Sequence, residues 1–288
     1  MNTISISQEK YGPWALVTGA SSGIGAEFAR QIAADKVSVV IVARRQERLN
    51  RLAEEIRGRF DVNVKVVVAD LTADSGIEAI KRETEDLEIG LLVNNAGRED
   101  SGNFLDTPVE AALDTLNLNT KAPLELTHHF ARRMADRGKG GIIFLSSIVA
   151  FQGVPYIANY AATKAYNLIF AESLAAELKR HNVDVVAAAP GFTDTELSPD
   201  FDFTGLPMKP MSPPAVVRIA LGALGRRNVA VPGMVNKALY YFGKYLLPRV
   251  ANTASFAKVF RAVLRGKLRQ DGADKLLETR GLRSVSGS

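Results

Sequence analysis

The sequence contains no cysteine and only three histidines among its 288 residues, and these absences exclude several kinds of site. Without cysteine there is no disulfide framework, no thiolate nucleophile and no cysteine-ligated metal cluster. His128 and His129 are adjacent and His181 is distant, so we expect no metal site built from histidine. The chain also lacks an apolar run of membrane-spanning or signal-peptide length. We therefore expect a cytoplasmic protein without a resident metal.

The remaining composition is that of an ordinary globular protein, with 47% hydrophobic and 23% charged residues. Its formal net charge of +5 is unevenly distributed. Residues 1–205 hold 21 basic and 28 acidic side chains, whereas residues 206–288 hold 15 basic and 3 acidic ones. The C-terminal part therefore carries all the excess positive charge, which indicates either an anionic partner or only a solvated face.

Short apolar runs rich in β-branched residues alternate with longer segments of helical spacing. The strand candidates are residues 14–18, 37–43, 64–69, 91–94, 141–146, 183–189 and 228–231. The helical segments include residues 24–34, 46–59, 108–137 and 158–180. Strands that are apolar throughout are covered on both faces. The pattern predicts an α/β fold of the Rossmann type, a doubly wound and mainly parallel seven-stranded sheet with helices on both faces.

We expect one dinucleotide-binding and catalytic domain over residues 1–232, because no repeat or linker divides it. Four prolines between residues 207 and 214 predict a loop with short helices. Residues 196–214 are the expected substrate loop. Residues 233–288 form an apolar, basic extension, expected to be helical with a flexible tail.

The first strand candidate runs into a glycine-rich turn, and a helical segment follows. The turn reads Gly19, Ala20, Ser21, Ser22, Gly23, Ile24 and Gly25. Glycine lets the backbone turn sharply and approach a pyrophosphate, and the helix N-terminus supplies N–H groups to the anion. Since the turn joins the first strand to the first helix of a βα series, we expect a dinucleotide-binding loop rather than a turn alone.

The end of the second strand candidate carries Arg44 and Arg45, where an acidic residue would bind the ribose hydroxyls of NAD. Two guanidiniums suit a 2′-phosphate, so we expect NADP(H), with NAD(H) still possible. Alternatively, the two arginines only begin a solvated helix, since Arg48 and Arg51 follow. Asp70 follows the third strand, where it either reaches the adenine edge or caps a helix.

Tyr160 and Lys164 are four residues apart in a helical segment, which puts both side chains on one face. A phenol with a pKa of about 10 needs a neighbouring cation to act as an acid-base group near neutral pH. Ser147 follows an apolar strand at the sheet edge where ligands bind, and its hydroxyl can donate to a substrate carbonyl. We expect these three side chains to form the catalytic site.

These motifs together resemble the short-chain dehydrogenase/reductase family, in its main single-domain branch. The matching elements, in family order over residues 11–232, are residues 18–25, residues 94–97, Asn119, Ser147, Tyr160, Lys164, Pro190 and Gly191. The resemblance implies an NAD(P)-dependent oxidoreductase acting on CH–OH groups, in which the cofactor carries the hydride. It leaves NAD(H) open, because Ser22 stands where members that prefer NADP(H) can carry a basic residue.

The resemblance also implies a role for each matched residue. Tyr160 would protonate the carbonyl oxygen or act as the base in oxidation, and Ser147 would orient that oxygen. Lys164 would lower the tyrosine pKa and bind the nicotinamide ribose, and Asn119 would hold a water that links Lys164 to solvent. The remaining cofactor positions would be Gly19, Ser21, Ser22, Gly23, Ile24, Gly25, Asp70, Leu71, Asn95, Ala96, Gly97, Pro190, Gly191, Thr193 and Thr195.

The loops expected at the substrate end, residues 151–157 and 196–214, are apolar and aromatic. They favour a lipophilic carbonyl or alcohol substrate, steroid-like or 3-oxoacyl, unless these side chains only pack a lid on the domain. The segments 236–247 and 253–269 combine apolar faces with cations. We favour docking on the core or a subunit contact, as in a homo-dimer or homo-tetramer, over peripheral membrane contact through residues 234–269. We expect no nucleic-acid partner.

The predicted function is therefore an NADP(H)-dependent oxidoreductase of a lipophilic carbonyl or alcohol. An NAD-dependent alcohol dehydrogenase and a catalytically silent dinucleotide-binding sensor or scaffold are the alternatives. The intact set of Asn119, Ser147, Tyr160 and Lys164 argues against the silent protein.

Overall fold

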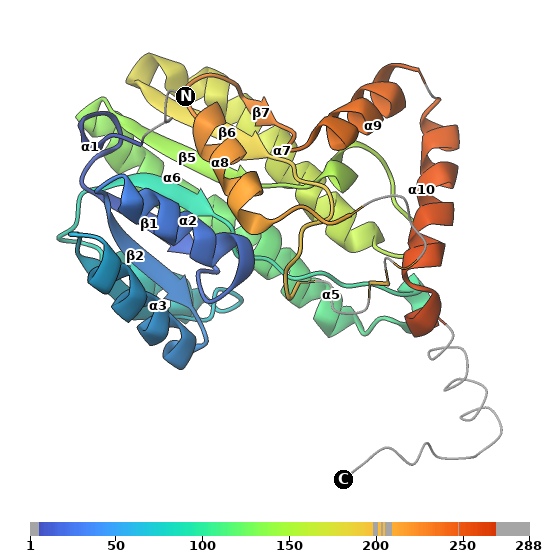
Figure 1. Ribbon diagram of the computed structural model, residues 1–288, viewed down its shortest axis with the longest axis horizontal. Coiled ribbons are helices and arrows are strands. Elements are labelled where there is room, and N and C mark those ends of the chain that lie inside the picture. The colour runs from blue at the N-terminus through green and yellow to red at the C-terminus, as the bar shows by residue number, and fades with distance from the viewer. Residues whose placement is uncertain (1–5, 198–200, 203, 205–208, 247, 269–288) are drawn as a thin grey trace, which may run out of the picture.

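The structure, a computed structural model, describes residues 6–197, 201–202, 204, 209–246 and 248–268 (Figure 1). Its centre is a sheet with the strand order β3-β2-β1-β4-β5-β6-β7, in which every pairing is parallel. The strands are β1 (Trp14–Thr18), β2 (Ser38–Ala43), β3 (Val64–Val68), β4 (Ile89–Asn94), β5 (Gly140–Leu145), β6 (Val183–Ala188) and β7 (Val229–Ala230). The predicted doubly wound fold is confirmed.

Helices cover both faces of this sheet. They are α1 (Gln8–Tyr11), α2 (Gly23–Ala34), α3 (Gln46–Arg59), α4 (Asp74–Glu83), α5 (Val109–Leu116), α6 (Ala122–Arg137), α7 (Ala158–Leu178), α8 (Pro213–Ala223), α9 (Met234–Tyr245) and α10 (Arg249–Val263). Helices α2, α3 and α8 share one buried cluster with alternate strand residues, and α4, α6 and α7 share the other. Val39 and Ile41 of β2 face the first cluster, whereas Val40 and Val42 face the second. Burial on both faces explains why the strands are apolar throughout.

The helices differ from the expectation in two places. The predicted helical segment 108–137 is helical from Val109 to Arg137, but the π-helical turn η2 (Asn117–Lys121) interrupts its α-helical hydrogen bonding and divides it into α5 and α6. The proline-rich region does not continue as a loop through residue 214, because α8 begins at Pro213. Pro213 and Pro214 occupy the first helical positions, where a missing N–H costs no intrahelical hydrogen bond. The remainder of the predicted substrate loop includes residues 198–200, 203 and 205–208, which lie outside the described residues.

Helices α9 and α10 follow β7 and stand together at one end of the molecule (Figure 1). Phe260 of α10 and Leu264 are fully buried against Val149, Ile157 and Tyr160. The C-terminal helices therefore complete the wall around Tyr160. The predicted flexible tail, residues 269–288, lies outside the described residues. Among the described residues, no helix is both long enough and apolar enough to cross a bilayer.

Candidate active site

The turn between β1 and α2 is built for close backbone approach. Gly19 has a φ of 67°, and a Cβ on Gly25 would lie 2.3 Å from the carbonyl oxygen of Gly19. Only glycine fits both positions. Ser22 is the N-cap of α2, but its side chain makes no capping hydrogen bond to the helix. The first N–H groups of α2 therefore have no side-chain cap and are suited to bind an anion.

Asn95 and Thr18 hold this turn against the end of β4. The Asn95 amide Nδ2 donates to the Thr18 carbonyl oxygen at 2.8 Å. The Thr18 hydroxyl oxygen accepts from the backbone N–H groups of Asn95 and Ala96, each at 3.0 Å. These hydrogen bonds fix the floor of the cavity at the point where the strand order reverses, which is where open α/β sheets bind ligands.

Arg45 lies beside the glycine-rich turn and holds a carboxylate there. Its Nη2 donates to the hydroxyl oxygens of Ser21 at 2.9 Å and Ser22 at 2.7 Å. Its Nη1 donates to Glu196 at 2.8 Å, and Arg48 donates to the same carboxylate at 2.7 Å. These hydrogen bonds from Arg45 and Arg48 hold the pKa of Glu196 below its usual value. The structure thus shows an anion seated between two guanidiniums next to the glycine-rich turn.

Arg44 points to a different part of the same cavity. Its Nη1 lies 3.7 Å from the Asp70 carboxylate. Asp70 also accepts hydrogen bonds from the backbone N–H of Thr72 at 3.0 Å and from its hydroxyl at 2.8 Å, and these bonds lower the pKa of Asp70. Asp70 thus closes a local turn and is not the N-cap of α4, which is Ala73. Its contact with an adenine edge stays a prediction.

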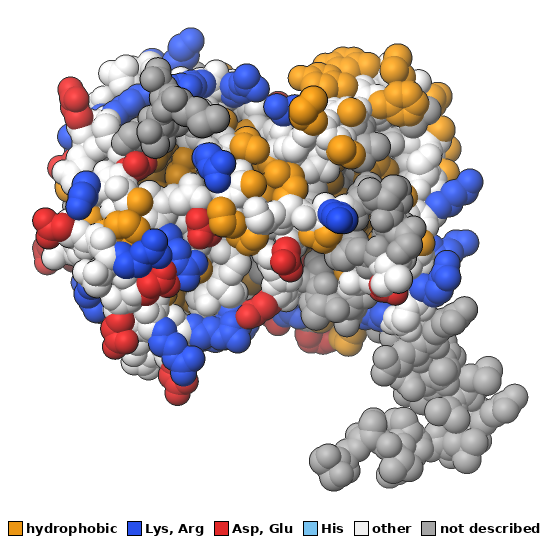
Figure 2. Space-filling model, viewed as in Figure 1, with side chains coloured by type: hydrophobic (Ala, Val, Ile, Leu, Met, Phe, Trp, Pro, Cys, Tyr) orange, Lys and Arg blue, Asp and Glu red, His pale blue; other side chains and the backbone are white. Residues whose placement is uncertain are grey.

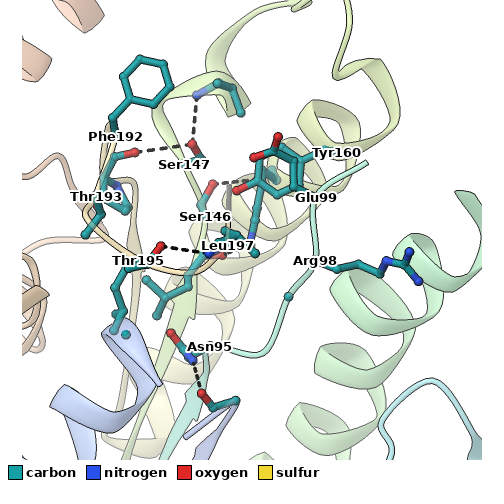
Figure 3. A pocket seen from close by; sticks show the side chains of 18 of the residues that line it. Asn95, Arg98, Glu99, Ser146, Ser147, Tyr160, Phe192, Thr193, Thr195 and Leu197 are labelled. Carbon is teal, nitrogen blue, oxygen red and sulfur yellow. Dashed lines mark hydrogen bonds between the residues drawn. The ribbon is translucent and has the colours of Figure 1, made fainter. Parts of the chain in front are cut away.

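Tyr160 and Ser147 meet at the other end of the cavity. Figure 3 shows Tyr160 beside Glu99, across from Thr193 and Thr195, with the Ser147 side chain between the two sides. Burial raises the pKa of the Tyr160 phenol, and the Glu99 charge raises it further, whereas the hydrogen bond with Ser147 lowers it. Burial is the largest of these effects, so Tyr160 keeps its proton at neutral pH.

Lys164 lies one turn after Tyr160 on α7 and is only 4% exposed. Its Nζ donates to the carbonyl oxygen of Leu145 at 2.8 Å and lies 5.5 Å from the centre of the Tyr160 ring. Burial lowers the pKa of Lys164 to about 8, and the Glu99 charge opposes that shift. The predicted pairing of Tyr160 and Lys164 on one helical face is therefore present in the geometry, whereas the lowering of the tyrosine pKa by Lys164 stays a prediction.

Asn119 is fully buried in the π-helical turn, and its side chain joins two segments. It donates to the carbonyl oxygen of Arg98 at 2.9 Å and to the Thr163 hydroxyl at 3.0 Å. It accepts from the Arg98 N–H at 3.0 Å. Asn119 therefore holds the segment after β4 against α7 beside Lys164. Its predicted role in holding a water stays a prediction.

The segment after β6 forms the far side of the cavity. Thr193 donates to the carbonyl oxygen of Gly191 at 3.1 Å, and a Cβ on Gly191 would lie 2.4 Å from Asn236 of α9. A Cβ on Gly23 would lie 3.0 Å from the Thr195 side chain. The segment thus contacts α9 at Gly191 and the glycine-rich turn at Thr195. Thr193 and Thr195 both line the cavity.

Most of these residues line one cavity with a volume of about 920 Å³, whereas Thr18, Arg48 and Asn119 lie behind those that line it. The predicted cofactor positions lie along one side of it, from Gly19 and Arg44 to Lys164 and Gly191. Its other end is apolar and aromatic; the lining residues there include Val149, Phe192, Phe201, Phe242, Phe256 and Phe260. One cavity therefore joins an anion-binding end to an apolar end through Tyr160.

Sequence reasoning missed several residues in or beside the cavity. Arg48 was assigned to a solvated face, although it lies one helical turn from Arg45 and the spacing itself indicates a shared face. Glu99 has no motif that marks it, since its position beside Tyr160 depends on the path of the loop after β4. Phe256 and Val259 of α10 showed helical spacing, but the sequence left open which surface their face would cover.

Comparison with known proteins agrees with this geometry. A family model described as short chain dehydrogenase matches residues 13–202. The 7beta-hydroxysteroid dehydrogenase of Collinsella aerofaciens is 37% identical over 214 residues, which cover 74% of this chain and 80% of that protein. The very-long-chain 3-oxoacyl-CoA reductase of Anas platyrhynchos is 34% identical over 226 residues, which cover 75% of this chain and 70% of that protein.

Two solved structures share the fold along most of their length. A structure from a study of 7beta-hydroxysteroid dehydrogenase stereoselectivity has a TM-score of 0.80 at 31% identity, and the match covers 89% of this chain and 99% of that chain. A short-chain dehydrogenase from Sphingobium yanoikuyae in complex with NADPH has a TM-score of 0.73 at 31% identity. That match covers 96% of this chain and 98% of that chain.

Proposed function

The chain belongs to the short chain dehydrogenase family, and we propose that it reduces the carbonyl group of a lipophilic substrate with NADPH, or oxidises the matching alcohol with NADP+, through Tyr160. Membership of this family makes the protein an oxidoreductase acting on CH–OH groups. The cofactor, the proton donor and the class of substrate are the parts of the proposal that need support. The observation that carries it is the single cavity joining the anion-binding end to the apolar end through Tyr160.

The residues at the glycine-rich turn fit a nicotinamide dinucleotide. A bound cofactor supplies or accepts the hydride, which is chemistry that no side chain provides. The uncapped N-terminus of α2 suits the pyrophosphate, and Gly19 and Gly25 leave room for it. Arg45 and Arg48, which hold the Glu196 carboxylate, suit the 2′-phosphate that distinguishes NADP(H) from NAD(H). Arg44 and Asp70 lie where the adenosine would meet the end of β3.

Tyr160 is suited to donate a proton to the substrate oxygen. The Ser147 hydroxyl lies beside the phenol and orients the same oxygen. During reduction the carbonyl carbon accepts the hydride, and the phenol proton moves from the Tyr160 Oη to the carbonyl oxygen, which gives the alcohol. The positive charge of Lys164, 5.5 Å from the ring centre, stabilises the phenolate that remains. Since burial keeps Tyr160 protonated, the phenol is in the form that donates a proton during reduction.

The apolar end of the cavity supports a lipophilic substrate. Aromatic side chains from the segment after β6 and from α9 and α10 surround the space next to Tyr160. Such a surface binds an extended hydrocarbon skeleton and offers few partners to a sugar. Two relatives are named for a hydroxysteroid and for a very-long-chain 3-oxoacyl-CoA. We propose a steroid-like ketone or a long-chain 3-oxoacyl compound as the substrate class.

The experiment is a turnover assay with a matched panel of carbonyl compounds. Oxosteroids, long-chain 3-oxoacyl thioesters, small ketones and ketosugars are each tested with NADPH and with NADH. We expect NADPH consumption with the first two groups and little with the last two. If no member of the panel supports turnover, although NADPH binds, the silent dinucleotide-binding alternative replaces the enzyme.

A second copy of the chain fits the exposed apolar surface of α5 and α7. Val109, Leu113 and Ile169 are more than half exposed there, and Tyr166 is 38% exposed. Helix α7 carries Tyr160 and Lys164 on its buried side. An exposed apolar row on its other side indicates contact with a partner. We propose that this α5–α7 surface joins two copies. Molar mass in solution tests it, because Ile169→Glu is expected to convert a dimer into a monomer.

A further inference from the structure

Helix α9 and the start of α10 expose a continuous set of large apolar side chains. The α9 surface consists of Met234, Val235, Tyr241, Phe242, Tyr245, Leu246 and Val250. Their exposed fractions run from 51% for Phe242 to 87% for Met234. Figure 2 shows hydrophobic side chains gathered at this end of the molecule, over α9. An exposed apolar surface of this kind marks a contact with a partner or a membrane.

The two helices that carry the α9 surface bear charges of one sign. Residues 209–268 contain 11 lysines and arginines and no aspartate or glutamate. Lys237, Arg249 and Lys258 are exposed on the two helices that carry the surface. The α5–α7 surface differs, because Asp114 pairs there with Arg98 at 3.2 Å. Lys237, Arg249 and Lys258 thus place positive charge beside the α9 surface, and that charge is complementary to an anionic partner.

The same two helices form a wall of the substrate cavity. Phe242 lines the cavity and is also half exposed in the α9 surface. Gly243 approaches Asn252 so closely that a Cβ on it would lie 2.8 Å from the Asn252 amide nitrogen. On α10, Phe256 and Val259 line the cavity. The α9 surface therefore adjoins the apolar end of the cavity rather than the cofactor end.

We propose that the α9 surface docks on a lipid bilayer that contains anionic phospholipids. The apolar side chains enter the region between head groups and acyl chains, and Lys237, Arg249 and Lys258 interact with lipid phosphates. A second copy is the poorer occupant, because a two-fold contact would bring two sets of these cations together without a carboxylate among residues 209–268 of either copy. Docked in this way, the apolar end of the cavity lies next to the lipid phase, where a lipophilic substrate concentrates.

The test is co-sedimentation of the full chain with vesicles of phosphatidylcholine alone or mixed with phosphatidylserine. We expect binding to the anionic vesicles, weakening as salt rises, and little binding to phosphatidylcholine. Binding requires no turnover, so its failure is distinguishable from failure of the proposed carbonyl reduction.

The matched variants each add two glutamates near helix N-termini, where a carboxylate favours the helix. Val235→Glu with Val250→Glu changes the second residues of α9 and α10 and is expected to weaken vesicle binding by at least about tenfold. Phe104→Glu with Leu105→Glu, the first two residues of the 3-10 helix η1 (Phe104–Asp106), is the control and is expected to bind vesicles as the wild type does, because these exposed apolar residues lie outside both the α9 surface and the α5–α7 surface. Both variants are expected to keep the wild-type melting temperature and affinity for NADPH.

Two results would overturn the proposal. The first is an absence of binding to anionic vesicles at low salt by the wild-type chain. The second is wild-type vesicle binding by the folded Val235→Glu, Val250→Glu variant. A loss of self-association in that variant, with no vesicle binding by the wild type, would assign the α9 surface to a second copy instead.

Discussion

The ammonium of Lys164 lies 5.5 Å from the centre of the Tyr160 ring and donates a hydrogen bond to the carbonyl oxygen of Leu145. Both side chains are buried, and burial disfavours the charged form of each. The phenol therefore stays protonated, and the pKa of Lys164 falls to about 8. The site combines a proton donor with a cation that loses its charge not far above neutral pH.

This relationship predicts the pH dependence of reduction. Below pH 8 Lys164 is charged and stabilises the phenolate that forms when Tyr160 gives up its proton. As the pH rises through about 8, Lys164 becomes neutral, and the kcat for carbonyl reduction is expected to fall. A profile of kcat against pH under saturating NADPH measures it. A kcat that stays constant to pH 10 would contradict the role given to Lys164.

The same shift predicts that Lys164 destabilises the fold. Between pH 8 and the ordinary lysine value of 10.5, the unfolded chain binds more protons than the folded chain, so stability rises with pH across this window. At pH 7 Lys164 is charged, so the burial of its charge destabilises the folded chain to the full extent. Lys164→Met is expected to raise the free energy of unfolding at pH 7 by about 1–3 kcal/mol while abolishing turnover. Urea unfolding checks this, and a large loss of stability would refute it.

Replacing Asn119 is expected to lower the free energy of unfolding. Asn119→Ala leaves the Arg98 N–H and carbonyl groups without their side-chain partner in a partly buried place. We expect the free energy of unfolding to fall by about 2–4 kcal/mol. Asn103→Ala, which removes one exposed hydrogen bond to Asp106, serves as the control and is expected to cost less than about 1 kcal/mol. Equal effects of the two changes would show that the contacts to Arg98 contribute little.

Cofactor preference is expected to depend on the two guanidiniums that hold Glu196. Arg45→Ala with Arg48→Ala removes both, and the KM for NADPH is expected to rise by about tenfold to a hundredfold, since charge-assisted hydrogen bonds are lost. The KM for NADH should change by less than about twofold, because NADH has no 2′-phosphate. Arg51→Ala on the same helix is the matched control.

Glu196→Gln tests the same anion site by changing the carboxylate instead of the guanidiniums. It removes the carboxylate that Arg45 and Arg48 now hold, so a 2′-phosphate no longer competes with it. The KM for NADPH is expected to decrease and that for NADH to stay unchanged. Parallel changes for both cofactors in either set of variants would contradict recognition of the 2′-phosphate.

The sequence predicts the sheet well because burial on both faces leaves a direct signal. The run at residues 14–18 is apolar throughout, and it is β1. The π-helical turn at Asn117–Lys121 leaves no such signal in the sequence, because it inserts one extra residue into a helical turn without changing the composition of the segment. Helix α4 entered the sequence analysis only through the alternative that Asp70 caps a helix, since Ile77 and Ile80 are the only large side chains that it buries.

The site was predictable where local motifs define it and not where distant segments meet. The spacing of Tyr160 and Lys164 already places both on one face of α7. The contact between Glu196 and Arg48 joins residues 148 positions apart, and no local pattern reports it. The basic extension showed its charge in the sequence, but only the fold places its helices against the substrate end of the cavity.

The most direct measurement is NADPH consumption by Tyr160→Phe with a lipophilic carbonyl that the wild type reduces, alongside Tyr166→Phe as the matched control on the same helix. Phenylalanine keeps the buried ring and removes only the proton donor. We predict that kcat falls by at least about a hundredfold in Tyr160→Phe, that NADPH binds with unchanged affinity, and that Tyr166→Phe turns over as the wild type does. A Tyr160→Phe enzyme with wild-type kcat would contradict the assignment of Tyr160 as the proton donor.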